Sequence, residues 1–405
     1  METARSLEGV APLVESSSLP LRANVVSAGK SRLASIDRVR GLVIALMALD
    51  HVRDYFSNFA FDSTDLEHTS TALFLTRWIT HYCAPTFIFL AGVSARLVSV
   101  RTGTRGLQRF LLTRGVWLVL LEFTVVMFCW TFNFRYPMGL VMQVIWAIGA
   151  SMCVLAALVV LPALAVGVIA AIMIAGHNLL DPITPEAFGS WAPLWHVLHV
   201  PGKAPWGAVL YPLVPWVGVM ALGYALGAAY QWESARRQRA WFAIGAACCL
   251  GFLAIRALNG YGDPHPWSVQ ARDGFTWLSF LKVTKYPPSL AYVLMTLGPA
   301  LLLLAAFERV GSPLLRPVEV FGRVPLFAYV VHLALAHALA GTIGFIQGFG
   351  AAILTNIFLF YPEEWGFGLG GVYCAWLAVL IALYPLCAWF ASVKARRRDW
   401  WLAYL

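Results

Sequence analysis

The chain has 405 residues, of which 60% are hydrophobic and only 12% are charged. A soluble protein of this length cannot bury so much apolar surface, so the composition excludes an ordinary soluble enzyme and predicts an all-α, polytopic helical membrane protein. The formal net charge of +9 indicates no nucleic-acid partner, because cytoplasmic arginines next to anionic lipid headgroups account for it.

The two ends of the chain differ from the apolar middle. Residues 1–34 are polar, irregular and without the apolar core of a signal peptide, which predicts a disordered cytoplasmic tail. Residues 394–405 begin with KARRR and continue with two tryptophans, a pattern typical of a basic, amphipathic cytoplasmic tail at the membrane interface. The membrane domain is therefore expected over residues 35–393.

The first predicted span, 35–56, has an unusual charge content. Its apolar run, Gly41–Leu49, covers only about 14 Å as a helix, which is less than half of a bilayer. A crossing here must include Asp50 and His51, and ionisable groups at that depth cost about 2.5–3.5 kcal/mol, so they normally face a protein interior and mark a functional site. Arg40 and His51 are eleven residues apart and therefore lie on one helix face, about 16 Å apart along the axis.

About ten transmembrane helices are predicted from the apolar segments. Their expected ranges are 36–56, 72–95, 115–133, 141–160, 163–178, 207–229, 241–257, 287–307, 324–346 and 368–391. An even number places both termini on one side, and most of the 29 Lys and Arg residues then fall on that side, which the positive-inside rule assigns to the cytoplasm. Long external connections are expected at 177–207 and 259–285.

Other ionisable residues of the spans share the depth of His51. Arg77 and His81 lie four residues apart in the second span, and His332 lies near the centre of the ninth. Each has a simpler interpretation, because buried histidines often only bond to a neighbouring helix and Arg77 can extend to the outer surface.

The chemistry of these residues suggests group transfer. An imidazole can act as a base or carry an acyl group near neutral pH, so His51 is the expected catalytic residue. Asp50 or Asp54 would orient it, as a carboxylate does in hydrolase triads. Arg77 or His81 would stabilise negative charge that develops on a reacting oxygen. The seven cysteines lie in or beside spans without ligand spacing, so we predict no metal site and no disulfide framework.

Four sequence blocks resemble a known family. SIDRVRGL, APTFIFLAG, KYPPS and PLFAYVVHLALAH are similar to blocks in the bacterial relatives of heparan-alpha-glucosaminide N-acetyltransferase. The spacing of Arg40 and His51 also resembles a signature of the acyltransferase-3 membrane proteins. The resemblance implies acetyl transfer from cytoplasmic acetyl-CoA to an amine or hydroxyl, usually on a sugar or glycan, on the other side of a bacterial inner membrane. The family's essential histidine corresponds to either His51 or His68.

Acetyl-CoA as donor requires cations, because its phosphates are strongly anionic. Arg40 is the best-placed candidate, with Arg101, Arg105 and Arg109 as further ones that also follow the positive-inside rule. The expected partners are membrane lipid, acyl-CoA and a small-molecule or glycan acceptor, with a homodimer as an assembly to test. A secondary transporter or a flippase for a lipid-linked sugar is the competing interpretation, and binding of CoA distinguishes the two. A sensor or scaffold is a weaker third alternative, since it leaves the charged first span unexplained.

Overall fold

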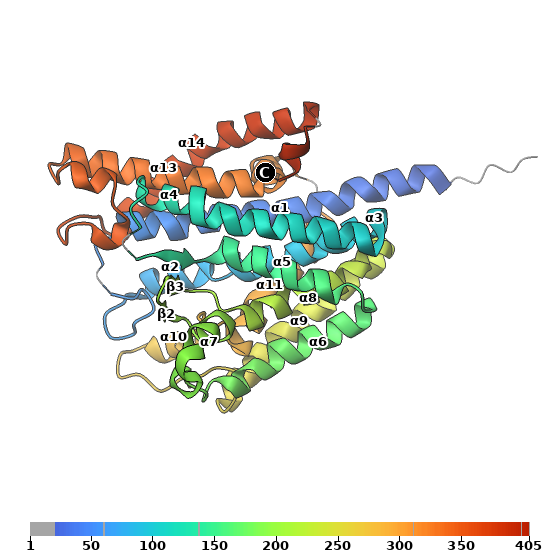
Figure 1. Ribbon diagram of the computed structural model, residues 1–405, viewed down its shortest axis with the longest axis horizontal. Coiled ribbons are helices and arrows are strands. Elements are labelled where there is room, and N and C mark those ends of the chain that lie inside the picture. The colour runs from blue at the N-terminus through green and yellow to red at the C-terminus, as the bar shows by residue number, and fades with distance from the viewer. Residues whose placement is uncertain (1–20, 60, 137, 311, 398, 405) are drawn as a thin grey trace, which may run out of the picture.

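The structure, a computed structural model, describes residues 21–59, 61–136, 138–310, 312–397 and 399–404. In these residues the chain is a bundle of long helices that run side by side along the long axis of the molecule (Figure 1). The α-helices are α1 (Leu21–Phe56), α2 (Thr71–Thr80), α3 (Cys83–Leu121), α4 (Met127–Thr131), α5 (Val144–Leu158), α6 (Ala163–Gly176), α7 (Ala192–Leu198), α8 (Leu213–Leu226), α9 (Ser234–Leu258), α10 (Phe275–Leu281), α11 (Leu290–Phe307), α12 (Arg316–Arg323), α13 (Pro325–Ile346) and α14 (Leu369–Arg396). Shorter turns of other helix types are η1 (Glu122–Val126), η2 (His177–Leu180), η3 (Pro185–Trp191), η4 (Gly227–Gln231), η5 (Pro313–Leu315), η6 (Ala351–Leu354), η7 (Phe358–Phe360) and η8 (Trp400–Ala403). The predicted helical class is confirmed.

Among the described residues, seven helical segments are long and apolar enough to cross a membrane, which supports a multi-pass membrane protein. They are Thr71–Thr131, Ala163–Leu180, Leu213–Gln231, Ser234–Leu258, Leu290–Phe307, Pro325–Ile346 and Leu369–Arg396. The charged α1 is not among them, and α5 is a shorter apolar helix. The expected count of about ten spans therefore stays a prediction.

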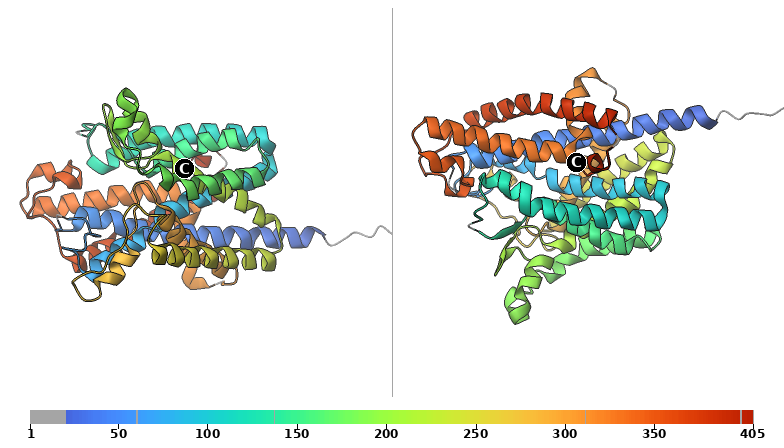
Figure 2. Two further views of the ribbon diagram at one scale, coloured as in Figure 1. Left: turned by 90° about the horizontal axis from the view of Figure 1, so that it is seen from below. Right: turned by 45° about the horizontal axis from the view of Figure 1, so that its top comes forward.

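The longest apolar segment contains a reversal of the chain. Gly103, inside α3, has φ of 67°, a conformation in which a side chain would be strained. Residues on both sides of it, including Ala91 and Leu118, line the same cavity, so α3 folds back on itself as two legs (Figure 2). The chain turns here within the basic stretch that was expected to link spans two and three.

Helix α1 packs closely against the C-terminal part of the chain. It contacts α12, α13 and α14, and its crossing with α12 is very tight. A Cβ atom at Gly41 would lie 1.7 Å from the carbonyl oxygen of Val318, and one at Gly322 would lie 1.8 Å from that of Asp37. Small residues at both positions let the two backbones meet, as is common between membrane helices.

One end of the bundle carries the loops. Three short strands, β1 (Leu140–Met142), β2 (Gly202–Ala204) and β3 (Gly207–Val209), form a sheet in the order β1-β3-β2. Strand β3 runs parallel to β1 and antiparallel to β2. The connection expected at 177–207 is thus an ordered segment that contains η2, η3, α7 and β2.

The expected tails differ from the structure in one respect. Helix α1 begins at Leu21, so residues 21–34 are helical rather than disordered. Residues 1–20 lie outside the described residues. The division of the chain into tails and a membrane domain, with both termini cytoplasmic, stays a prediction.

Candidate active site

Two histidines from distant parts of the chain meet in the core. Nδ1 of His51, on α1, lies 2.8 Å from Nε2 of His332, on α13, and the two ring planes are 6° apart. The rings of Trp130 and Tyr329 pack edge-on to His51, with centroids 5.1 and 6.0 Å away. His332 is fully buried. The expectation that these histidines share one depth agrees with this contact.

The hydrogen bonds assign the tautomers of this histidine pair. Nδ1 of His332 lies 2.8 Å from the carbonyl oxygen of Ala328, which can only accept, so this nitrogen carries a proton. Nε2 of a neutral His332 then accepts a hydrogen bond from Nδ1–H of His51. The remaining nitrogen, Nε2 of His51, then keeps its lone pair, since the one hydrogen bond of this ring to the described residues is through Nδ1. This arrangement leaves one imidazole nitrogen of His51 able to accept a proton.

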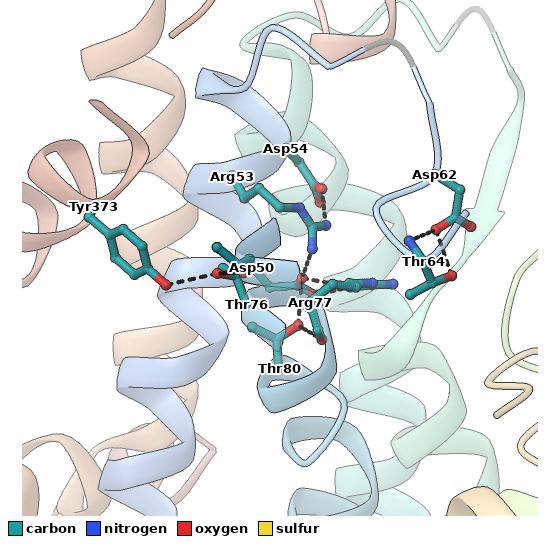
Figure 3. A network of polar contacts seen from close by, with 10 residues as sticks. Asp50, Arg53, Asp54, Asp62, Thr64, Thr76, Arg77, Thr80 and Tyr373 are labelled. Atoms are coloured by element: carbon teal, nitrogen blue, oxygen red, sulfur yellow. Dashed lines mark hydrogen bonds and ion pairs between the residues drawn. The ribbon is translucent and has the colours of Figure 1, made fainter. Parts of the chain in front are cut away.

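Asp50 belongs to a neighbouring ionic network (Figure 3). Nη1 of Arg77 donates to both of its carboxylate oxygens, at 2.6 and 2.7 Å, and the hydroxyl of Thr80 donates at 2.8 Å. Arg53 Nη1 lies 3.0 Å from Asp50 without hydrogen-bond geometry, and Arg53 Nη2 donates to Asp54 at 2.6 Å. Two arginines therefore balance two carboxylates in a part of the protein that is largely shielded from water.

This network changes the expected roles of the acidic residues. Neither Asp50 nor Asp54 hydrogen-bonds to His51 in the described residues, and His332 occupies the position expected for an orienting carboxylate. Neighbouring residues of a helix point in different directions, so the side chain of Asp50 cannot face the partner of His51. Arg77 does not extend freely to the surface but is held by Asp50.

Two other predicted histidines lie apart from the pair. His81 caps the end of α2, and its ring packs 5.5 Å from that of Tyr292 on α11. His68 lies in the loop after α1 with 62% of its side chain exposed and hydrogen-bonds to Asp65. This hydrogen bond raises the pKa of His68, which favours the protonated form that cannot accept a proton. The geometry thus favours His51 over His68 as the base.

A cavity with basic walls, which we call the basic cavity, lies on the Arg40 side of the histidine pair. Its volume is about 390 Å³, and most of its wall is apolar. The cationic residues in its lining are Arg40, Arg101, Arg114, Arg323 and Lys394. Arg40 also donates a hydrogen bond to Ser94 and pairs with Asp37 at 3.5 Å.

The basic cavity includes some of the expected arginines and not others. Arg105 and Arg109 are exposed and do not line it. Arg114, Arg323 and Lys394 were not expected, because they come from α3, α12 and α14 and only the fold brings them together. In the sequence, each of these three residues stands at the beginning or end of an apolar segment, on the side where most Lys and Arg residues are expected.

A second cavity, which we call the loop cavity, lies on the other side of the pair. It has a volume of about 520 Å³ and is formed by the end of α1, the loop after it and the 358–365 segment. The charged residues in its lining are Arg53, Asp54, Asp62, Arg77 and Glu363. It is therefore polar and of mixed charge, in contrast to the basic cavity.

Helix α1 contributes to both cavities, and α13 contributes to the basic cavity. On α1, Arg40 and Met47 line the basic cavity, His51 follows Met47 by one turn, and Arg53 already lines the loop cavity. On α13, Tyr329 lines the basic cavity and His332 follows it by one turn. Along α1, His51 thus lies between the residues that line the two cavities, although neither lining includes His51 or His332.

Comparison with known proteins identifies the family of the chain. A search of curated proteins finds no match. A family model described as heparan-alpha-glucosaminide N-acetyltransferase, catalytic, matches residues 32–261, which is more than half of the chain. The match includes His51 and ends before α13, so His332 lies outside it. The chain therefore belongs to the heparan-alpha-glucosaminide N-acetyltransferase family of membrane acetyltransferases.

Proposed function

We propose that this protein moves an acetyl group from acetyl-CoA, bound in the basic cavity, to an amine or hydroxyl of a sugar-like acceptor in the loop cavity. The observation that carries the proposal is the position of the His51–His332 pair between two cavities of different chemistry. The positive-inside rule assigns the basic cavity to the cytoplasmic side. Donor and acceptor would then reach the pair from opposite sides of the membrane.

The basic cavity suits a CoA thioester in two ways. Its five cationic residues can neutralise phosphates, and the arginines among them can bind phosphate oxygens through two hydrogen bonds at once. Its apolar walls, including Met47 and Tyr329, continue towards His51 and suit an extended pantetheine arm. A phosphate held by Arg40 would lie about 16 Å from His51 along α1, a distance that such an arm can cover.

The loop cavity suits a polar acceptor that carries an amine. Carboxylates from three segments line it, and that of Glu363 has no ion pair in the described residues. A protonated amine would be attracted here and would lose its proton before attack. Arg53 and Arg77 on the same wall are already paired with Asp50 and Asp54, so they add little free positive charge.

The chemical step can be written from the assigned tautomers. Nε2 of His51 takes the proton from the acceptor while the acceptor nitrogen or oxygen attacks the thioester carbonyl carbon. The carbon–sulfur bond breaks, and the proton on His51 passes to the departing thiolate, which gives free CoA. His332 stabilises the imidazolium by accepting from Nδ1–H of His51. In the alternative route, Nε2 carries the acetyl group itself before the acceptor attacks.

The test is acetyl transfer by purified His51→Ala protein with radiolabelled acetyl-CoA and glucosamine. We expect turnover to fall by about 10²- to 10⁴-fold, while binding of CoA, measured by thermal stabilisation, is kept. His68→Ala is the matched control, since this histidine is exposed, and it should keep activity. Normal turnover by His51→Ala would refute the role of His51, and failure of the unmodified protein to bind CoA would refute the donor.

A further inference from the structure

A second cluster of buried ionisable groups lies away from both cavities. It consists of His177 and Asp181, at the two ends of the η2 turn, and His199, which ends α7. The cluster is at the loop end of the bundle, where α7 lies below the strands in Figure 1. Neither cavity has any of these residues in its lining, so acyl transfer as proposed above does not use them.

The three side chains converge on one point. One ligand atom from each, two ring nitrogens and a carboxylate oxygen, lie within 4.8 Å of one another. Nε2 of His199 lies 3.0 Å from Oδ1 of Asp181, and the two imidazole rings have centroids 5.7 Å apart. His177 and His199 have exposed fractions of 2% and 0%, so water cannot solvate their rings.

The buried histidines leave ring nitrogens without partners. Neither nitrogen of His177 has a hydrogen bond in the described residues, nor does Nδ1 of His199. The carbonyl of Pro288 approaches the His177 ring without reaching hydrogen-bond geometry. A buried polar atom with no partner is costly, and a metal ion bound by one nitrogen of each ring would remove part of this cost.

The surroundings of the cluster also fit a metal site. Asn178 donates to Oδ2 of Asp181 at 2.8 Å, which leaves Oδ1 directed towards the histidines. The side-chain oxygen of Asn178 accepts from the backbone N–H of Leu290, at 3.0 Å, so the start of α11 holds this orienting residue in place. Such second contacts fix the direction of metal ligands and are typical of protein zinc sites.

We propose that His177, Asp181 and His199 bind one zinc ion, with water as the fourth ligand. Two imidazoles and one carboxylate suit Zn²⁺, whereas Mg²⁺ and Ca²⁺ prefer oxygen ligands alone. Bonds of about 2.0–2.1 Å place tetrahedral ligand atoms about 3.3 Å apart, so the side chains would close slightly around the ion. The sequence predicted no metal site because only cysteine spacing was considered, and His177 and Asp181 are separated from His199 by about half of the loop.

The ion would connect the end of α6 to the end of α7. The turns η2 and η3 lie between these helices, and the strands β2 and β3 follow α7 in the sheet of order β1-β3-β2. Zinc would therefore stabilise the loop end of the bundle and would not take part in the transfer chemistry. This inference does not rest on the proposed acetyl transfer.

The test uses full-length purified protein after removal of any affinity tag and of metal with a chelator. We expect titration with ZnCl₂ to give one bound ion per chain and a higher unfolding temperature. We also expect Co²⁺ to give the strong visible absorption of a tetrahedral site. His177→Gln and His199→Gln should each weaken zinc binding by more than about tenfold.

The matched control is His196→Gln. His196 lies on α7 one turn before His199, but it pairs with the carbonyl of Val200 and is not in the cluster. Its replacement should leave zinc stoichiometry and affinity unchanged. The proposal is overturned if the unmodified protein binds no stoichiometric zinc, or if the His177 and His199 variants bind it as well as the control does. Zinc binding by the unmodified protein tests the proposal by itself, so the test remains valid even if the variants fail to fold.

Discussion

The basic cavity and the loop cavity are similar in size but differ in how their charges are arranged. The basic cavity has five cationic side chains around apolar walls, whereas the loop cavity contains both signs of charge, several of them already paired. A lining with several cations and no carboxylate suits an anionic ligand with an apolar arm, and the mixed walls suit a polar, neutral or amine-bearing one. The difference indicates two substrates that enter separately, with the histidine pair as their meeting point.

The largest expected effect concerns the ionic network of Asp50, whose Arg53, Asp54 and Arg77 line the loop cavity. Asp50→Asn removes the carboxylate that Arg77 and Arg53 share, which leaves positive charge unpaired and largely buried. We expect a loss of about 3–5 kcal/mol in the free energy of unfolding, seen as a lower unfolding temperature. Asp65→Asn, in the exposed loop, is the control and should change little.

A double variant sharpens this prediction. If the charge on Arg77 causes the instability, Asp50→Asn combined with Arg77→Gln should lose less than the two single changes added together. Strict additivity would contradict a direct interaction between the two side chains.

The next effect is on the histidine pair. His332→Ala removes the acceptor that fixes the tautomer of His51, so we expect turnover to fall by about 100-fold, with little change in KM for acetyl-CoA. His332→Gln offers an oxygen acceptor and should restore part of the rate. The pH dependence of turnover should change in the Ala variant, because the protonation of His51 is no longer set by His332.

A second buried histidine on the same helix provides the control for this change. His337 hydrogen-bonds to the carbonyl of Cys129 and stacks on Phe132, away from His51. His337→Gln should alter stability without changing the pH profile. The same pH change in both variants would mean that His332 acts only through packing.

A smaller effect is expected in the basic cavity. Arg40→Ala should raise KM for acetyl-CoA by about tenfold, because a charge-assisted hydrogen bond to phosphate is lost, and should leave KM for the acceptor unchanged. Arg105→Ala is the matched control, as this arginine is exposed and does not line the cavity. Equal effects of the two changes would show that general positive charge, and not this cavity, attracts the donor.

The smallest effect is expected in the loop cavity. Glu363→Gln should raise KM for an amine acceptor by about threefold, since one exposed carboxylate contributes little in water. KM for acetyl-CoA should not change. An effect on the donor instead of the acceptor would reverse the assignment of the two cavities.

Sequence reasoning selected α1 for the candidate site but could not predict the contacts of its side chains. The short apolar run before Asp50 drew attention to α1, and the helical period placed Arg40 and His51 on one face. It could not identify His332 as the partner of His51, because hydrogen bonds across helices depend on how α1 and α13 pack. The side chains of Arg114, Arg323 and Lys394 meet for the same reason.

The fold was predictable to a similar extent. Apolar segments indicated where the helices lie, because a helix in a membrane presents apolar side chains to lipid or to neighbouring helices. The ordered structure of residues 177–207 was missed, because its helical turns are short, its strand β2 depends on pairing with β3, and the segment lacks an apolar period. The cluster of His177, Asp181 and His199 in that segment was missed for the same reason.

The most direct test of two substrates meeting at one histidine pair is the sidedness of transfer. Protein is reconstituted into lipid vesicles with a single orientation, glucosamine is sealed inside, and labelled acetyl-CoA is added on the side of the basic cavity. We predict acetylated product inside the vesicles, formed by the unmodified protein and absent with His51→Ala. In a parallel sample, glucosamine is supplied on the same side as acetyl-CoA. Product formed in that sample, but never inside the vesicles, would contradict the account.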